Sequence, residues 1–170
     1  MNNSAKNIYK EEKRKKIKQE LDIKRLPCAV GISESKFFEN VGGIIRTINA
    51  FLLQEIVLDE KVYNKYACAG ADKWENIIIQ KDIISYFKKN NYTLIALEQH
   101  EKSIPLWDFK FPLKSAIIMG HEVQGMTDEM LNQCDFTIEI PQYGLVESLN
   151  VSTATSIALY EYSRQHRACL

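Results

Sequence analysis

Short apolar runs alternate along most of this chain with longer segments in which apolar residues recur at helical spacing. The runs are rich in β-branched residues and apolar on both faces, which predicts buried strands at 28–32, 55–58, 76–79, 93–97, 116–119 and 136–140. Helices are predicted at 5–24, 41–53, 81–89, 128–133 and 151–166, with a short helical or irregular piece at 63–69. Because helices separate most of the strands, we expect an α/β fold with a mostly parallel sheet and helices on both faces.

The charges divide the chain into two parts. Its 170 residues fit one domain, and 45% hydrophobic and 26% charged residues are ordinary for a globular protein. The net charge is zero, but residues 1–25 hold nine Lys or Arg against four acids. This predicts a basic, helical N-terminal arm at 1–25 and one domain at 26–170. The arm either contacts phosphates or is a solvated amphipathic helix, and charge alone favours the second interpretation.

Neither a targeting signal nor a membrane span is predicted. Residues 1–25 lack a central apolar stretch, and nowhere do roughly 18 apolar residues follow one another. The four cysteines are scattered, with no CxxC pair and no His at metal spacing, and Cys28 and Cys134 are typical of small core residues. The simplest expectation is a cytoplasmic protein without structural disulfides or a metal.

Ligands of such sheets bind beyond the carboxyl ends of the strands, where three loops stand out by their chemistry. In the first loop, 40–47, Asn40 is a favourable N-cap, two glycines permit close approach, and Arg46 follows within two turns. The helix N-terminus and Arg46 could together hold a phosphate. The alternative is a capped core helix with a surface arginine. The dinucleotide-binding pattern GxGxxG is absent.

The second loop, 119–127, is a polar turn bracketed by Gly120 and Gly125. It could present backbone amides to a nucleotide-like ligand, with Glu122 accepting a hydrogen bond from a ribose hydroxyl. Thr127 is a favourable cap for the helix that follows. An ordinary strand-to-helix connection is the alternative interpretation.

The third loop, 140–152, carries the densest chemistry. Ser148 and Asn150 lie at a strand-to-helix junction, where free backbone N–H groups and two polar side chains can meet a ligand. A mere connector needs only about 2–6 residues. The following helix carries small residues that allow close packing, either against another subunit or against another element of the same chain: Ala154, Ser156 and Ala158.

These three loops, in this order, resemble the motifs of the SpoU-type (TrmH-like) RNA 2′-O-ribose methyltransferases of the SPOUT superfamily, over roughly residues 28–165. The resemblance is carried by Asn40, Gly43, Arg46, Thr47, Ala50 and Phe51, by Gly120, Glu122 and Gly125, and by Pro141, Gly144, Val146, Ser148, Leu149, Asn150 and Val151. It implies an α/β fold with a C-terminal deep trefoil knot, which general chain-packing rules would not suggest. It also implies a homodimer with the active site at the subunit interface, and S-adenosylmethionine bound in the knot.

The resemblance also implies roles for individual residues, with no metal needed. Cofactor binding falls to Met119, Gly120, Glu122, Gly125, Ile140, Ser148 and Leu149. Arg46 would act on the ribose 2′-hydroxyl, while Asn40, Ser148 and Asn150 orient the groups around it. Arginine is a poor base because its pKa is about 12 or more, so phosphate-assisted proton loss, or orientation and charge stabilisation by Arg46, is physically easier. The net charge of +5 in residues 1–25, and not the resemblance, motivates the hypothesis that RNA contacts Arg46 and four residues of the arm: Lys13, Arg14, Lys15 and Lys16.

The substrate is narrowed by weaker features. Residues 70–74, and Glu98 with Gln99 ahead of Ser103, resemble the branch that methylates the D-loop guanosine of tRNA, which favours tRNA over ribosomal RNA. Two departures, Phe37 and His121, replace asparagines common in the family and leave the substrate open.

Three alternatives remain. One is the same reaction on ribosomal RNA. Another is a catalytically silent RNA-binding dimer, against which the intact catalytic set argues. The third is a nucleotide- or flavin-binding protein, but 33–36 lacks the glycine loop that such a protein needs after its first strand.

Overall fold

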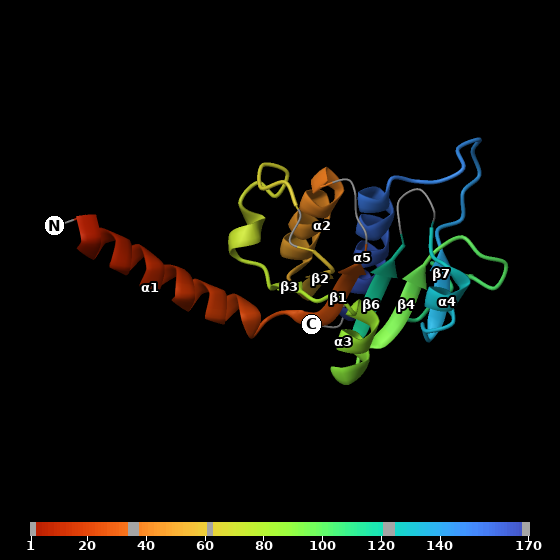
Figure 1. Ribbon diagram of the computed structural model, residues 1–170, viewed down its shortest axis with the longest axis horizontal. Coiled ribbons are helices and arrows are strands. Elements are labelled where there is room, and N and C mark those ends of the chain that lie inside the picture. The colour runs from red at the N-terminus through yellow and green to blue at the C-terminus, as the bar shows by residue number, and fades with distance from the viewer. Residues whose placement is uncertain (1–2, 34–37, 61–62, 121–124, 168–170) are drawn as a thin grey trace.

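The computed structural model describes residues 3–33, 38–60, 63–120 and 125–167 and confirms the predicted α/β fold (Figure 1). Phe37, His121 and Glu122 lie outside the described residues. Seven strands form one sheet in the order β3-β2-β1-β6-β4-β7-β5, and neighbouring strands pair in parallel. The strands are β1 (Leu26–Ile32), β2 (Leu53–Leu58), β3 (Ile77–Ile79), β4 (Thr93–Leu97), β5 (Ile104–Pro105), β6 (Ser115–Met119) and β7 (Phe136–Glu139).

Helices cover both faces of this sheet, as the two-sided apolar strands predict. On one face α2 (Phe38–Phe51) and α5 (Val151–Arg167) pack together over one hydrophobic core. On the other face α3 (Ile83–Lys89) and the short α4 (Asp128–Leu131) cover a second core, in which Phe87 is completely buried. The central strand β6 is therefore buried along its whole length, and the loops at its carboxyl end are held on a rigid base.

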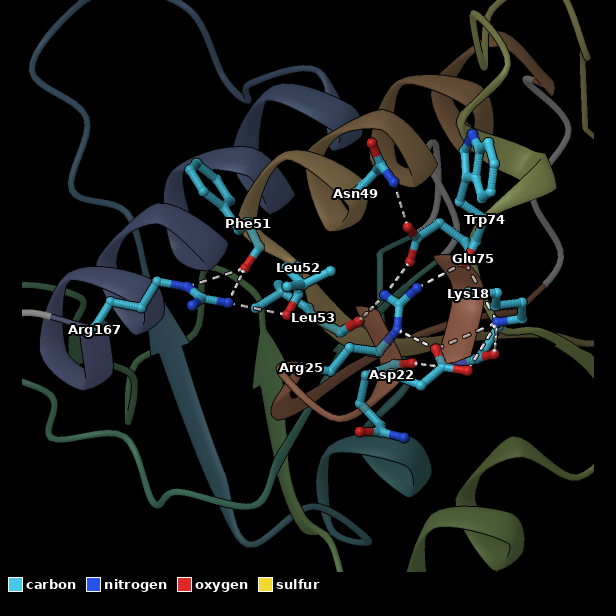
Figure 2. Close-up of polar contacts among 12 residues, drawn as sticks. Lys18, Asp22, Arg25, Asn49, Phe51, Leu52, Leu53, Trp74, Glu75 and Arg167 are labelled. Atoms are coloured by element: carbon cyan, nitrogen blue, oxygen red, sulfur yellow. Dashed lines mark hydrogen bonds and ion pairs between the residues drawn. The ribbon is translucent and has the colours of Figure 1, made fainter. Parts of the chain in front are cut away.

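The N-terminal helix α1 (Asn3–Asp22) extends away from the sheet (Figure 1). It is joined to the domain through Arg25, whose guanidinium donates to Glu75 at 2.6 Å, to Asp22 at 2.7 Å and to the Leu53 carbonyl oxygen at 2.6 Å (Figure 2). A buried arginine just beyond the last turn of α1 therefore helps to fix the position of this helix.

Two arginines, one at the start of the domain and one at the end of α5, converge on the junction between α2 and β2. From α5, Arg167 donates to the carbonyl oxygens of Phe51 at 2.8 Å and Leu52 at 3.2 Å (Figure 2). Arg25 binds the next carbonyl, that of Leu53. The two arginines thus bind three consecutive carbonyl groups where the chain passes from α2 into β2, and the Leu52 carbonyl oxygen also accepts from the Leu26 N–H at 3.0 Å.

Element boundaries differ from the predictions in a few places. The helix α2 begins at Phe38, so Asn40 lies inside the first turn and is not the N-cap that the sequence predicted. Leu53 opens β2 instead of closing the helix, because Leu52 takes a left-handed conformation, with φ of 51°, that ends α2. The sequence does not predict β5, since two residues including a proline show no strand pattern. The predicted cap at Thr127 is confirmed by its 3.3 Å hydrogen bond from the Met130 N–H.

Three of the cysteines lie among the described residues, and each is buried or partly buried. Cys28 is fully buried in the core, as predicted, and Cys28, Cys68 and Cys134 are free thiols. Burial, with help from Asp135, raises the pKa of the Cys134 thiol to about 11. Among the described residues, no helix combines the length and apolarity that a membrane span requires.

Candidate functional site

A cavity of about 410 Å³ opens at the carboxyl ends of β4, β6 and β7. This volume lies within the range of about 300–1,000 Å³ that is typical of small-molecule sites. Its lining comes from the ends of these strands, from two of the predicted loops and from the start of α5: Leu97, Glu98, Gln99, Met119, Gly120, Gly125, Glu139, Ile140, Gln142, Glu147, Ser148, Leu149, Val151 and Ala154. The position agrees with the rule that parallel sheets bind ligands beyond the carboxyl ends of their strands.

The cavity gathers the described residues that the sequence assigns to the cofactor. Met119, Gly120, Gly125, Ile140, Ser148 and Leu149 all line it. Glu122 lies outside the described residues. Two loops that follow β6 and β7, which β4 separates in the sheet, therefore form one site, as their resemblance to a single set of motifs implies.

Glycine is required at both ends of the second loop. A Cβ at Gly120 would lie 2.6 Å from the carbonyl carbon of Gly125, so the loop returns onto its own start. Gly125 has φ of +67°, and a Cβ there would lie 2.9 Å from Oε2 of Glu98. The bracketing glycines thus allow two backbone segments to meet at the wall of the cavity.

Several lining residues were missed from the sequence: Leu97, Glu98, Gln99, Glu139, Gln142, Glu147, Val151 and Ala154. The available signal was the exit of the strand 93–97, which ends at the same edge of the sheet as the two strands whose exits were chosen. This exit, 98–103, is polar but contains no glycine, in contrast to the two loops that the sequence singled out.

The cavity suits a ligand that carries positive charge and hydrogen-bond donors. Glu98, Glu139 and Glu147 are in its lining, whereas its described lining contains no lysine, arginine or histidine. The side-chain oxygen of Gln142 is buried, and among the described residues no donor reaches it. Because buried polar groups are almost always hydrogen-bonded, this amide oxygen indicates a place for a ligand donor.

Beside the cavity, α2 and α5 bring Asn40 and Asn150 together. The amide nitrogen of Asn150 donates to Oδ1 of Asn40 at 2.9 Å. The Oδ1 atom of Asn150 accepts from the backbone N–H groups of Ser152 at 3.0 Å and Thr153 at 3.3 Å, so Asn150 caps the start of α5. Asn40 is thus not the N-cap of α2, but it contacts Asn150, which is the N-cap of α5.

The small residues of these two helices determine how closely they pack. A Cβ at Gly43 would lie 2.5 Å from Oγ of Ser152, so in a variant with a larger residue this hydroxyl would have to rotate away. One turn on, the hydroxyls of Thr47 and Ser156 are 2.8 Å apart, and Ala158 is completely buried. The sequence left open whether the small residues of α5 pack within the chain or against another subunit. Ser156 and Ala158 pack within the chain.

Within a single chain, Arg46 does not lie in the cavity lining with Ser148 and does not contact the other predicted catalytic residues. It lies exposed on α2, outside the cavity lining, and it has no hydrogen bond or ion pair with the described residues. Ser148 is exposed at the cavity mouth. One chain therefore unites Asn40 with Asn150 and places Ser148 against the cavity, but it leaves Arg46 facing outward.

The predicted RNA-binding residues of the arm are exposed on α1: Lys13, Arg14, Lys15 and Lys16. Lys15 forms a loose ion pair with Glu11 at 3.9 Å. Farther along the helix, Lys18 instead turns toward the domain and donates to the Asn76 side chain at 2.5 Å (Figure 2). The charges at 13–16 are thus available to a partner, whereas Lys18 helps to attach the helix.

Comparisons with known proteins agree with this geometry. The model of the SpoU rRNA Methylase family matches residues 28–160. A tRNA (guanosine(18)-2′-O)-methyltransferase of Saccharomyces cerevisiae is 35% identical over 139 residues, which is 75% of this chain and 10% of that protein. The protein of the same name from Aquifex aeolicus is 28% identical over 165 residues, 91% of this chain and 77% of that protein.

Solved structures show the same fold. The crystal structure of the A. aeolicus TrmH/SpoU tRNA modifying enzyme superposes with a TM-score of 0.81 at 26% identity, covering 94% of this chain and 85% of that one. An AdoMet-bound rRNA methyltransferase from Sinorhizobium meliloti superposes with a TM-score of 0.73 at 24% identity, covering 82% of this chain and 56% of that one, which is a likeness of fold alone.

Proposed function

Because this chain belongs to the SpoU rRNA methylase family, we propose that it transfers a methyl group from S-adenosylmethionine to a ribose 2′-hydroxyl of tRNA. The observation that carries the proposal is the cavity, which two loops with the family's motifs form together at the carboxyl edge of the sheet. The names of the yeast and A. aeolicus relatives support a D-loop guanosine as the target. The chain spans about a tenth of the length of the yeast relative, so the proposal rests on the catalytic domain.

The described residues fit S-adenosylmethionine. Its sulfonium and ammonium groups suit a lining that contains Glu139 and Glu147, and its amino groups can supply the donor that Gln142 lacks. The backbone at Gly120 and Leu149 would hold the nucleoside part. When bound, the cofactor supplies an electrophilic methyl group, and the protein needs to align it with the 2′-oxygen.

We propose that the chain's own chemistry is positioning and charge stabilisation. Asn40 and Asn150 already hold each other at 2.9 Å and would orient the ribose at the start of α5. Arg46 would stay protonated and stabilise negative charge as the 2′-hydroxyl loses its proton, with an RNA phosphate as a possible acceptor. Ser148 lies between the cavity and solvent, where the substrate would enter.

We also propose that the loop 140–150 forms the trefoil knot implied by the family and that two chains form a dimer. Large apolar side chains are exposed on this loop and on α5: Tyr143, Leu145, Val146, Ile157 and Tyr160. Exposed apolar groups of this kind favour a protein interface. In a two-fold dimer the outward-facing Arg46 of one chain would reach the cavity of the other, which explains why one chain leaves it unassembled.

The activity is tested by incubating the protein with methyl-labelled S-adenosylmethionine and either unmodified tRNA or ribosomal RNA, followed by nucleoside analysis. We expect label in 2′-O-methylguanosine of tRNA. The control tRNA carries 2′-deoxyguanosine at the D-loop target and should accept no label. Label confined to ribosomal RNA would move the substrate to the second alternative, and cofactor binding without labelled RNA would favour the silent RNA-binding dimer.

The exposed charges of α1 give a prediction about RNA affinity. Substituting Lys13, Arg14, Lys15 and Lys16 together by glutamine is expected to weaken tRNA binding. The slope of log K against log salt should fall by up to about 3, since each lost phosphate contact removes about 0.7–0.9. Filter binding of tRNA between low and moderate salt measures both effects, and this variant keeps Lys18 and the attachment of the helix.

A matched control substitutes four exposed lysines outside α1: Lys81, Lys88, Lys89 and Lys110. We expect it to change the salt slope much less. Equal slopes for the two quadruple variants would show that α1 is a solvated helix without a specific role in RNA binding.

A further inference from the structure

Two consecutive side chains at the exit of β4 reach both loops that form the cavity. Glu98 contacts the second loop, at Gly125 and Met126, and Gln99 contacts the third loop, at Glu147. These loops follow different strands, β6 and β7, which lie on either side of β4 in the sheet. The exit of β4 is therefore the place from which one short segment can hold both.

Glu98 holds the returning end of the second loop with its carboxylate. Its Oε2 atom accepts from the backbone N–H of Met126 at 2.9 Å, and its Oε1 atom accepts from the backbone N–H of Gln99 at 3.0 Å. Gly125 leaves room for this carboxylate, because a Cβ at this position would lie 2.9 Å from Oε2. Each of the two oxygens accepts a hydrogen bond from a backbone N–H. A carboxylate can do this on both sides, whereas the amide of a glutamine has only one acceptor oxygen.

Gln99 holds the third loop. Its Nε2 atom donates to the carbonyl oxygen of Glu147 at 3.0 Å, one residue before Ser148. Residues 143–148 are otherwise exposed, so this bond is a tie across the cavity mouth and not part of a packed core. A side chain on a fixed strand end thus limits the movement of a loop that lines the cavity.

The backbone that carries the pair is itself fixed. The N–H of Glu98 donates to the carbonyl oxygen of Ile138 at 3.0 Å, which continues the pairing of β4 with β7. The hydroxyl of Ser103 donates to the carbonyl oxygen of Glu98 at 2.9 Å and accepts from the N–H of His100 at 3.1 Å. The main chain that carries the two side chains is therefore held on both sides, while Gln99 itself is exposed.

We infer that Glu98 and Gln99 are positioning residues that set the affinity of the cavity for its cofactor by tying together the two loops that enclose it. The inference rests on the proposed function, because it takes the ligand to be S-adenosylmethionine. A cofactor that must first order two free loops binds more weakly, since the ordering entropy is lost on binding. The pair therefore acts on cofactor binding, and tRNA recognition by α1 is unaffected.

The test uses Glu98→Gln, which is isosteric and removes one acceptor, and Gln99→Ala. Each is expected to raise the Kd for S-adenosylmethionine, measured by calorimetry, about three- to tenfold, the range for losing a modest hydrogen bond. The KM for tRNA and the midpoint of thermal unfolding should stay unchanged. Gln133→Ala is the matched control, because Gln133 also donates from Nε2 to a backbone carbonyl, that of Glu129, but away from the cavity.

Amide hydrogen exchange without cofactor tests the ties separately. Gln99→Ala should speed exchange in 143–149, and Glu98→Gln should speed exchange of the Met126 amide, while Gln133→Ala changes neither. Wild-type protein that binds no S-adenosylmethionine would overturn the proposed function and this inference with it. Wild-type protein that binds it, with both variants binding equally well, would overturn the inference alone.

Discussion

Arg46→Ala is expected to lower the rate of methyl transfer by at least a hundredfold while leaving S-adenosylmethionine binding and the fold intact. Loss of one donor positioned at developing negative charge lowers kcat by about 10²–10³ in other enzymes. The fold should tolerate the change because Arg46 is exposed and makes no hydrogen bond with the described residues. Single-turnover rates with saturating tRNA, together with the Kd for the cofactor, measure the two effects separately.

Two variants sharpen the assignment of Arg46. Arg46→Lys keeps the charge but loses the planar, forked donor set, so it should recover only part of the activity if geometry matters. Arg164→Ala removes another exposed arginine, on α5, and should keep nearly the full rate. Near wild-type turnover by Arg46→Ala would show that the catalytic role is assigned to the wrong residue.

The same variant tests whether Arg46 acts on the partner's cavity. Mixing Arg46→Ala chains with chains whose cavity is blocked by Gly120→Val gives mixed dimers in which one composite site is intact. Random mixing of a two-fold dimer should then restore about a quarter of the wild-type activity. If each chain used its own Arg46, every site in the mixture would be defective and activity would stay at the background.

The sheet could be predicted because its signal is local. Runs such as 116–119 are apolar on both faces, and this requires burial on both sides whatever the rest of the chain does. The strand at 93–97 is found at the predicted residues, and the strand at 136–140 differs only by its last residue. The two-residue strand β5 has no such pattern and exists because β7 offers it a partner.

The site could be predicted only in part, for a related reason. Gly120 and Gly125 were found because tight turns demand glycine in the local sequence. Glu98 and Gln99 gave no local signal for the cavity, since their partners lie 28 and 48 residues farther along the chain. Asn40 is a residue type that favours the N-cap, but it lies inside α2 and contacts Asn150, 110 residues farther along the chain. Contacts of this length follow from the topology and are visible only in the structure.

The pair of Arg25 and Glu75 is another contact between distant residues that the sequence did not predict. Its loss is expected to have a large effect on the free energy of unfolding. Both side chains are completely buried, and their N–O distance is 2.6 Å. Burial disfavours the charged guanidinium, yet the hydrogen bonds to Glu75 and Asp22 outweigh it and raise the pKa of Arg25 above its ordinary value. Glu75 also accepts from the amide of Asn49 on α2 at 2.6 Å (Figure 2). The pair therefore joins α1, the start of β2 and the helix that carries Arg46.

Arg25→Met or Glu75→Leu is expected to lower the free energy of unfolding by about 3–5 kcal/mol, because each leaves the other charge buried without its partner. The double variant should lose less than the sum of the two single losses, since neither charge then remains. It should not recover fully, because the Leu53 carbonyl oxygen loses its hydrogen bond from Arg25 and the Trp74 carbonyl oxygen keeps only the longer one from Lys18. Urea unfolding followed by circular dichroism measures all three variants.

The exposed pair of Arg164 and Glu161 is the matched control for burial. It has the same chemistry, with two N–O hydrogen bonds of 2.8 and 2.7 Å, but the Arg164 side chain is 54% exposed. The Glu161 side chain is 14% exposed and keeps its 2.8 Å hydrogen bond from Gln165 when Arg164 is replaced. Water can replace its partner, so Arg164→Met should hardly move the urea midpoint. If the buried and the exposed arginine proved equally dispensable, Arg25 would not join α1 to the domain. If only the buried one matters, loss of Arg25 should also weaken tRNA binding, because the basic helix loses its fixed direction.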